Sequence, residues 1–156
     1  MRSGVTCRLG LAKTSRGEPV AIVLVADTQI LVWYVRDPSR LTKAAVEALE
    51  SATANGDVVG VSAFSIVELV YATEKATNPI SLDDLNAIKS VLNDQASPFQ
   101  IIEVDDQIAF RVASVPRVFN ADPGERIIVA TAEVLGLPLV SSDSKIPGMT
   151  SLTVIW

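Results

Sequence analysis

Acidic residues with the potential for chemistry stand at four separated places in the sequence: Asp27, Glu68, the pair Asp122 and Glu125, and Asp143. Asp27 directly follows the apolar run 20–26, and Asp143 comes shortly after the apolar residues 139–140. The chain has no histidine and one cysteine. This excludes imidazole bases, Ser-His-Asp triads, and zinc sites built from histidine or several cysteines. Acid–base or metal chemistry must therefore run on Asp, Glu, Lys, Tyr or Ser.

If the acids meet in the fold, their charges need compensation. Clustered carboxylates repel one another unless some are protonated or a cation holds them together. An all-oxygen donor set suits Mg²⁺ or Mn²⁺ rather than Zn²⁺. One or two carboxylate-held Mg²⁺ ions activate water and stabilise the displacement at a phosphodiester. The acids thus predict a metal site suited to cleaving phosphodiesters.

Each acid also has a purely structural explanation, because acidic side chains cap helices and turns. Asp27 could cap a following helix, although an unpartnered charge after a buried strand is costly. Ser65-x-x-Glu68 and the sequence Asp122-Pro123-Gly124-Glu125 both match a capping box. Asp143 could lie in an ordinary turn. Several acids at one predicted edge favour function over capping alone.

Charged and aromatic neighbours of these acids leave further alternatives open. Arg126 either pairs locally with Glu125 or contacts a phosphate or carboxylate. We interpret Lys145 as a solvated side chain, with a catalytic role as the alternative. Trp33 and Tyr34 are interpreted as core or interface residues rather than as platforms for stacked bases.

From residue 20 onward, the hydrophobic pattern alternates between strand and helix. It predicts strands at 20–26, 58–61, 99–104, 139–141 and 152–156, and helices at 31–35, 42–54, 65–75, 81–92, 105–115 and 122–135. Such alternation implies a parallel sheet covered on both faces. Ligands of such sheets bind at the carboxyl ends of the strands. This rule selects Asp27 and Asp143, with Ser62 and Glu68 following the second strand.

Length and composition predict one compact domain. The chain has 156 residues, of which 49% are hydrophobic, and a net charge of −5, which argues against non-specific nucleic-acid binding. The longest apolar run, Val20–Ala26, is too short to span a membrane. The apolar excess therefore predicts a core or a subunit interface. The single cysteine fits a reducing, cytoplasmic location.

Residues 1–19 differ from the rest, with four basic residues against one acidic residue and no hydrophobic region of a secretory signal. We expect a mobile N-terminal extension there, with a basic RNA-contacting arm as the alternative, and a nuclease-like domain over 20–156.

Four sequence blocks occur in order: VLVADTQILVW at 23–33, SAFSIVEL at 62–69, DPGERIIVATA at 122–132 and GLPLVSSD at 136–143. Together they resemble the PIN-domain ribonucleases, specifically the VapC-type toxins of bacterial type II toxin–antitoxin pairs. The first is similar to that family's first strand with Asp-Thr-His, and the second to its Ser-x-x-(Ser/Thr)-x-x-Glu helix. The third is similar to its Asp-Pro-x-Asp-Arg helix, and the fourth to its final strand, with Ser141 at a Thr or Ser position.

The resemblance implies a three-layer α/β/α sandwich with a mainly parallel, about five-stranded sheet. It also implies an Mg²⁺- or Mn²⁺-dependent endoribonuclease, acting as a toxin that blocks translation, a homodimer, and a cognate VapB-like antitoxin. It makes Asp27, Glu68, Glu125 and Asp143 the metal-site acids. Thr28, Arg126 and Ser141 are then auxiliary residues.

Two departures from the family pattern matter. Gln29 replaces the usual His, and Glu125 stands where Asp is usual, which leaves Asp122 as the alternative third metal acid. The second functional hypothesis is a catalytically silent PIN-like module that binds RNA or a partner. A haloacid-dehalogenase-type phosphatase would need an acid at position 29, and a receiver domain would need paired acids after the first strand. Neither is present.

Overall fold

A five-stranded parallel sheet forms the centre of the computed structural model, which describes residues 12–13, 19–77, 79–117 and 122–156. In spatial order its strands are β5 (Phe99–Ile102), β4 (Val58–Ser62), β3 (Ile22–Ala26), β6 (Leu139–Val140) and β7 (Val154–Ile155). All four neighbouring pairs are parallel. The parallel sheet expected from the alternating pattern is therefore confirmed.

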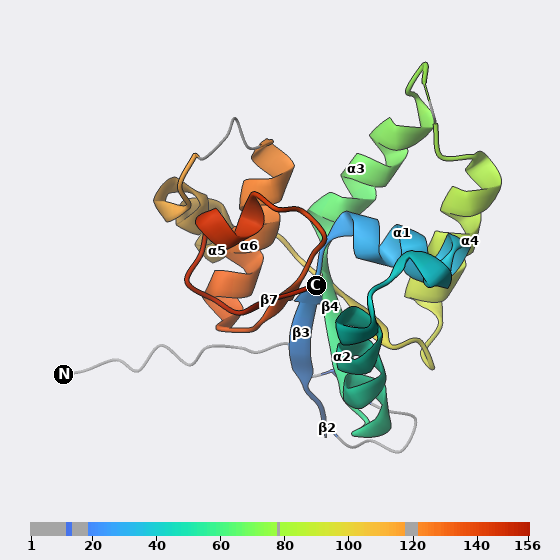
Figure 1. The fold of residues 1–156 in the computed structure, drawn as a ribbon, viewed down its shortest axis with the longest axis horizontal. Helices are drawn as coiled ribbons and strands as arrows, with labels where there is room; N and C mark the ends of the chain where they lie inside the picture. Colours follow the sequence, from blue (N-terminus) through green and yellow to red (C-terminus); the bar gives the residue numbers. More distant parts are fainter. Residues whose placement is uncertain (1–11, 14–18, 78, 118–121) are drawn as a thin grey trace.

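Helices cover both faces of this sheet (Figure 1). They are α1 (Thr28–Arg36), α2 (Lys43–Ala54), α3 (Ala63–Thr73), α4 (Leu82–Asn93), α5 (Asp106–Arg111) and α6 (Pro123–Leu135). Among the described residues, short 3-10 helices lie at Pro38–Arg40, Val112–Ser114 and Ile146–Gly148. Helices α1, α2 and α4 lie on one side of the sheet, and α5 and α6 lie on the other.

The central strand β3 divides the hydrophobic core in two because successive side chains of a strand point to opposite faces. Leu24 and Ala26 belong to the cluster under α1, α2 and α4. Val25, between them, belongs to the cluster under α5 and α6. A strand buried on both faces explains the continuous apolar run in the sequence. The three-layer α/β/α architecture is confirmed.

Element boundaries differ from the predicted ones at several ends. Helix α1 begins three residues earlier than expected, at Thr28, because Asp27 caps it through an Ile30 N–H···Oδ1 bond of 2.9 Å. The predicted helix 105–115 is α-helical only to Arg111 and continues as the 3-10 turn Val112–Ser114. The last strand shortens to Val154–Ile155. The capping box that starts α4 and the left-handed Gly136 that ends α6 are as predicted.

Most of the predicted N-terminal extension lies outside the described residues. Within it, β1 (Ala12–Lys13) pairs antiparallel with β2 (Pro19–Val20). In the described part of the chain, no helix has the length and apolar character needed to cross a membrane.

Candidate functional site

The neighbouring strands β3 and β6 bring Asp27 and Asp143 to the same edge of the sheet. The Asp27 N–H donates to the Val140 carbonyl at 3.1 Å, so the two strands end side by side. The Ser141 hydroxyl donates to the carboxylate of Asp27, which is only 7% exposed. The same Ser141 oxygen accepts the Asp143 N–H at 3.1 Å. Ser141 therefore links the two acids that the strand-end rule selected.

Glu68 reaches this edge from α3 and does not cap a helix. Helix α3 follows β4 without a loop and begins at Ala63 with Ser62 as its N-cap, so the predicted capping box from Ser65 to Glu68 is wrong. Ser65 is instead fully buried inside the helix, 2.8 Å from the Thr28 hydroxyl. Thr28 in turn donates to the Glu68 carboxylate. With the capping role removed, Glu68 remains as a carboxylate held in place from α1.

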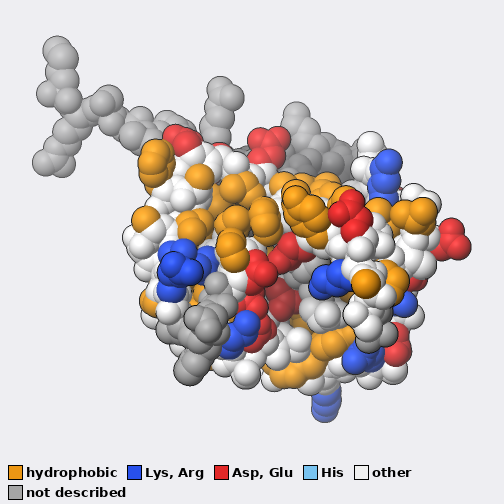
Figure 2. Space-filling model, turned by 90° about the horizontal axis from the view of Figure 1, so that it is seen from above, with side chains coloured by type: hydrophobic (Ala, Val, Ile, Leu, Met, Phe, Trp, Pro, Cys, Tyr) orange, Lys and Arg blue, Asp and Glu red, His pale blue; other side chains and the backbone are white. Residues whose placement is uncertain are grey.

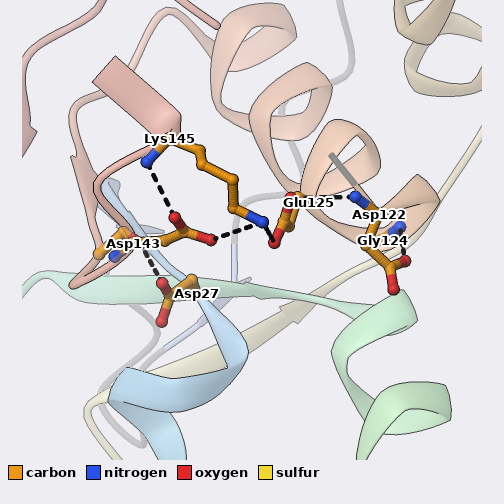
Figure 3. Close-up of polar contacts among 7 residues, drawn as sticks. Asp27, Asp122, Gly124, Glu125, Asp143 and Lys145 are labelled. Atoms are coloured by element: carbon orange, nitrogen blue, oxygen red, sulfur yellow. Dashed lines mark hydrogen bonds and ion pairs between the residues drawn. The ribbon is translucent and has the colours of Figure 1, made fainter. Parts of the chain in front are cut away.

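Asp122 and Glu125 do form the predicted capping box at the start of α6 (Figure 3). The Asp122 side chain accepts the Gly124 N–H at 2.9 Å, and Glu125 Oε2 accepts the Asp122 N–H at 3.0 Å. Their environments differ, because Asp122 is exposed whereas Glu125 is partly buried. Glu125 lines a hollow together with Asp27, Glu68 and Asp143, and Asp122 is absent from its lining. Figure 2 shows acidic side chains gathered in this hollow.

Gly124 permits a close approach between α6 and α3. A β-carbon at this position would collide with Oε1 of Glu68 and lie 2.8 Å from the Phe64 ring. Glycine at the second position of α6 therefore leaves room for the Glu68 carboxylate beside the helix start.

Burial and repulsion from neighbouring acids raise the pKa of two acids of the hollow, Asp27 and Glu68. Burial raises the pKa of Asp27, and the nearby Asp143 adds to this, against the hydrogen bonds from Ser141 and the Ile30 N–H. Burial also raises the pKa of Glu68, with contributions from Asp122, Asp27 and Glu125, against the Thr28 hydrogen bond. A cation in the hollow would relieve both effects.

One cation is already present, because the Lys145 ammonium lies between two of the acids (Figure 3). Its Nζ is 2.6 Å from Oε1 of Glu125 and 3.5 Å from Oδ2 of Asp143. The hydrogen bond to Glu125 raises the pKa of Lys145. Burial pulls the pKa of Asp143 upward, but the Lys145 N–H and ammonium, with Glu125, outweigh it and lower this pKa. The interpretation of Lys145 as a merely solvated side chain is therefore wrong.

Arg126 does not form the local ion pair with Glu125 that was considered for it, and its guanidinium bonds to backbone carbonyls instead. Its Nη2 donates to the Val112 and Val115 carbonyls at 2.7 and 2.9 Å, and its Nε to that of Val115 at 3.2 Å. Val112 begins the 3-10 helix after α5 and Val115 directly follows it, so these hydrogen bonds hold that segment against α6. The expected pairing with Glu125 is replaced by these bonds.

A groove of about 860 Å³ continues from the acidic hollow and shares Thr28, Gln29 and Glu68 with it. Its other walls carry the cationic side chains of Arg36, Arg40 and Lys75, together with Trp33. Basic side chains flank the acidic hollow on either side in Figure 2. Asp37 also lines the walls of the groove, so three cations and one acid line it beyond the residues that it shares with the hollow.

The two aromatic residues of α1 behave differently. Tyr34 packs edge-on against Phe99 with 4.9 Å between ring centroids, which confirms its interpretation as a packing residue. Trp33 lies 5.4 Å from the Trp156 ring, and the Arg40 guanidinium lies 4.9 Å from its ring centroid. Trp33 thereby forms part of the groove wall while packing against the last strand's end.

The hollow suits a hard divalent cation such as Mg²⁺, because its charged side chains are all carboxylates and offer oxygen atoms as ligands. The Lys145 ammonium marks a place where Glu125 and Asp143 accept a positive charge. As they stand, no three acidic side chains among the described residues approach closely enough to form a ready-made metal site. The charge arrangement supports a cation site. The sequence analysis considered Lys145 but did not predict its ion pairs with Glu125 and Asp143. Its only sequence signal is its position two residues after Asp143.

Comparisons with known proteins agree with this geometry. The profile of the PIN domain family matches residues 24–150. Ribonuclease VapC22 of Mycobacterium tuberculosis is 28% identical over 123 residues, which cover 79% of this chain and 88% of that protein.

Two solved structures share the fold. VapBC2 from Rickettsia felis bound to a promoter DNA fragment has a TM-score of 0.63 at 14% identity, covering 85% of this chain and 97% of that one. DNA-bound VapBC from Salmonella typhimurium has a TM-score of 0.61 at 17% identity, covering 85% and 96%. Since the family profile spans most of the sequence, the chain belongs to the PIN domain family.

Proposed function

We propose that this chain is a divalent-metal-dependent endoribonuclease and the toxin of a toxin–antitoxin pair, which blocks translation by cleaving RNA. The observation that carries the proposal is the convergence of carboxylates from four separate segments on one hollow at the carboxyl edge of the sheet. Membership of the PIN domain family and similarity to a protein named ribonuclease VapC22 support it.

We propose that Asp27, Glu68, Glu125 and Asp143 hold Mg²⁺ or Mn²⁺. When bound, the metal would supply an activated water and stabilise charge on the displaced phosphodiester oxygens. Such ligands work best when neighbouring hydrogen bonds fix their orientation. Ser141 would do this for Asp27, and Thr28 for Glu68, through the hydrogen bonds described above.

The groove beside the hollow offers a path for a single RNA strand. Its cations suit phosphates, which supply most of the affinity of nucleic-acid complexes. Arg36 is partly neutralised by Asp84 at 3.0 Å, whereas Arg40 and Lys75 have exposed charges near the path. A local row of cations reconciles RNA binding with the acidic net charge of the chain.

Protein partners are also part of the proposal. The acidic hollow would attract a basic segment of a VapB-like antitoxin, whose Arg side chains would compete with the metal for the carboxylates. Inhibition should then weaken as Mg²⁺ or salt rises.

Exposed apolar side chains on α3, namely Val67, Val70 and Tyr71, provide a surface for a homodimer. Light scattering of the purified chain without antitoxin tests the dimer.

The experiment that tests the function is cleavage of end-labelled, structured RNA by the purified chain. We expect discrete fragments with Mg²⁺ or Mn²⁺ and none in excess EDTA, because the carboxylates need a divalent cation to act. Arg40 and Lys75 are expected to contact the phosphates, so RNA affinity should fall as salt rises. RNA binding without cleavage under all metal conditions would instead support the catalytically silent module.

Substituting Gly124 by Ala should impair cleavage more than folding. Ala is favoured over Gly in a helix by roughly 0.5–1 kcal/mol, which offsets part of the steric cost. The new methyl group would displace the Glu68 carboxylate, whose side chain can move, and press on the Phe64 ring. We expect cleavage to fall by at least about tenfold, as for a disturbed ligand environment, with a melting temperature close to that of the wild type. Unchanged cleavage would show that the position of Glu68 does not matter.

A further inference from the structure

Lys145 lies beside the hollow, where it contacts two of the lining acids, and the proposed chemistry has no use for its charge. Its ammonium lies between Glu125, at the start of α6, and Asp143, after β6 (Figure 3). The three side chains are only partly exposed, at 32% for Lys145 and 21% and 27% for the two acids. The ion pairs are therefore screened less by solvent than pairs on the open surface.

The backbone of Lys145 is fixed, while its side chain is not. Its N–H donates to Oδ1 of Asp143 at 2.9 Å, and the following 3-10 helix is anchored by the buried side chains of Ile146 and Met149. The four-carbon stem beyond Cα carries several rotatable bonds. The ammonium can thus leave the hollow without any change in the fold.

Both carboxylate oxygens of Glu125 already have partners. Oε2 accepts the Asp122 N–H at 3.0 Å within the capping box, and Oε1 accepts the Lys145 ammonium at 2.6 Å. Oε1, which takes no part in the helix cap, is therefore the oxygen that a metal ion would take up with least disturbance of α6. A metal ion bound there would repel the Lys145 ammonium that occupies the same oxygen, so the two cations would compete for Glu125.

We infer that Lys145 is an internal counter-ion that competes with the divalent cation for Glu125 and Asp143, so that metal binding and withdrawal of the ammonium are one coupled step. The inference rests on the proposed function, because it takes these two acids as metal ligands. Without metal, Lys145 neutralises part of the acidic hollow. With metal, that role passes to the ion, and the apparent metal affinity is reduced by the cost of displacing the ammonium.

The test is calorimetric titration of Mn²⁺ into the metal-free, full-length chain, without RNA. Lys145→Met keeps the length of the side chain and removes its charge. We expect Mn²⁺ to bind this variant about fivefold more tightly, the factor that corresponds to a partly exposed ion pair. Lys145→Arg, which retains a cation at the same place, should remain near the wild-type affinity or below it. Lys43→Met is the matched control, because Lys43 is exposed and pairs only with Glu47 among the described residues.

Melting curves supply a second readout. In EDTA, Lys145→Met should melt below the wild type, and in saturating Mn²⁺ the difference should close, because tighter binding stabilises the variant more. Equal or weaker Mn²⁺ binding by Lys145→Met, or equal tightening in Lys43→Met, would overturn the inference and leave the metal site standing. If neither wild type nor variant binds Mn²⁺, both the metal site and the inference are wrong. Mn²⁺ binding with the expected shift but without RNA cleavage would contradict the proposed function alone.

Discussion

Asp27→Asn is expected to abolish metal-dependent RNA cleavage and, in the metal-free protein, to raise stability. The amide keeps an oxygen for the Ile30 N–H, so α1 remains capped, and Asn is as good an N-cap as Asp. It lacks the charge that a metal ligand needs, so cleavage should fall by well over ~100-fold, beyond the loss typical of outer-shell changes. Removing a buried, desolvated charge should raise the free energy of unfolding at pH 7.

The pH dependence of this stability gain has a definite sign. Burial raises the folded-state pKa of Asp27 above the ordinary value of 3.8, so the folded state binds the proton more tightly than the unfolded state. The stability associated with that proton is present below pH 3.8 and is lost as pH rises through the raised pKa. The difference in melting temperature between Asp27→Asn and the wild type in EDTA should therefore be small in acid and largest near pH 7.

Asp83→Asn is the control, because this acid is exposed on α4 and does not line the hollow. It should give no gain in stability and no loss of cleavage. A wild-type level of cleavage by Asp27→Asn, or a lower melting temperature than wild type at pH 7 in EDTA, would contradict the assignment of Asp27 as a buried acid held for metal binding.

The second large effect is expected from Glu125→Gln, compared with Asp122→Asn. Gln at this position can still accept the Asp122 N–H, so the capping box survives and the change isolates the charge. We expect cleavage to fall at least about tenfold with folding intact. Asp122→Asn should retain most of the cleavage, because Asp122 is exposed, does not line the hollow, and is replaced by an equally good N-cap. Cleavage rates with melting curves for both variants provide the measurement.

Glu125→Asp adds a third arm to this comparison. This change restores the Asp that is usual at this position in the VapC-type pattern, and we expect the variant to keep a sizeable part of the cleavage activity. If the pattern inverts, so that Asp122→Asn is folded but inactive and Glu125→Gln is only mildly affected, Asp122 is the third metal acid instead.

Two capping patterns show how much of the local structure the sequence could predict. Ser65-x-x-Glu68 and Asp122-x-x-Glu125 match the same motif, yet only the second is a capping box. The first fails because β4 continues to Ser62 and passes into α3 without a loop, so Ser65 already lies within the helix. Local sequence cannot fix that point, since the strand's length depends on its pairing with β3 and β5.

Residues placed by topology were predicted well, and residues placed by long-range contacts were not. Asp27 and Asp143 follow neighbouring parallel strands, so a general rule of α/β sheets brings them together. Lys145 meets Glu125 across 20 residues of sequence, and Arg126 reaches carbonyls 11 and 14 residues away. Neither contact has a periodic signal, and the motif that contains Arg126 does not indicate these carbonyl partners. Long flexible side chains find their partners only once the elements are packed.

In the strand order β5-β4-β3-β6-β7, the strands of one side of the sheet are synthesised before those of the other. The first half of the sheet is encoded by residues 22–102, whereas β6, Asp143 and β7 come only after residue 138. A chain growing from its N-terminus can therefore pair β3, β4 and β5 while the fourth acid is still unmade. The hollow gains Asp143 and its neighbouring lysine together, and the Trp33–Trp156 contact forms later still. The acidic hollow therefore stays incomplete until the last segments of the chain have been made, which would keep the proposed nuclease inactive during its own synthesis.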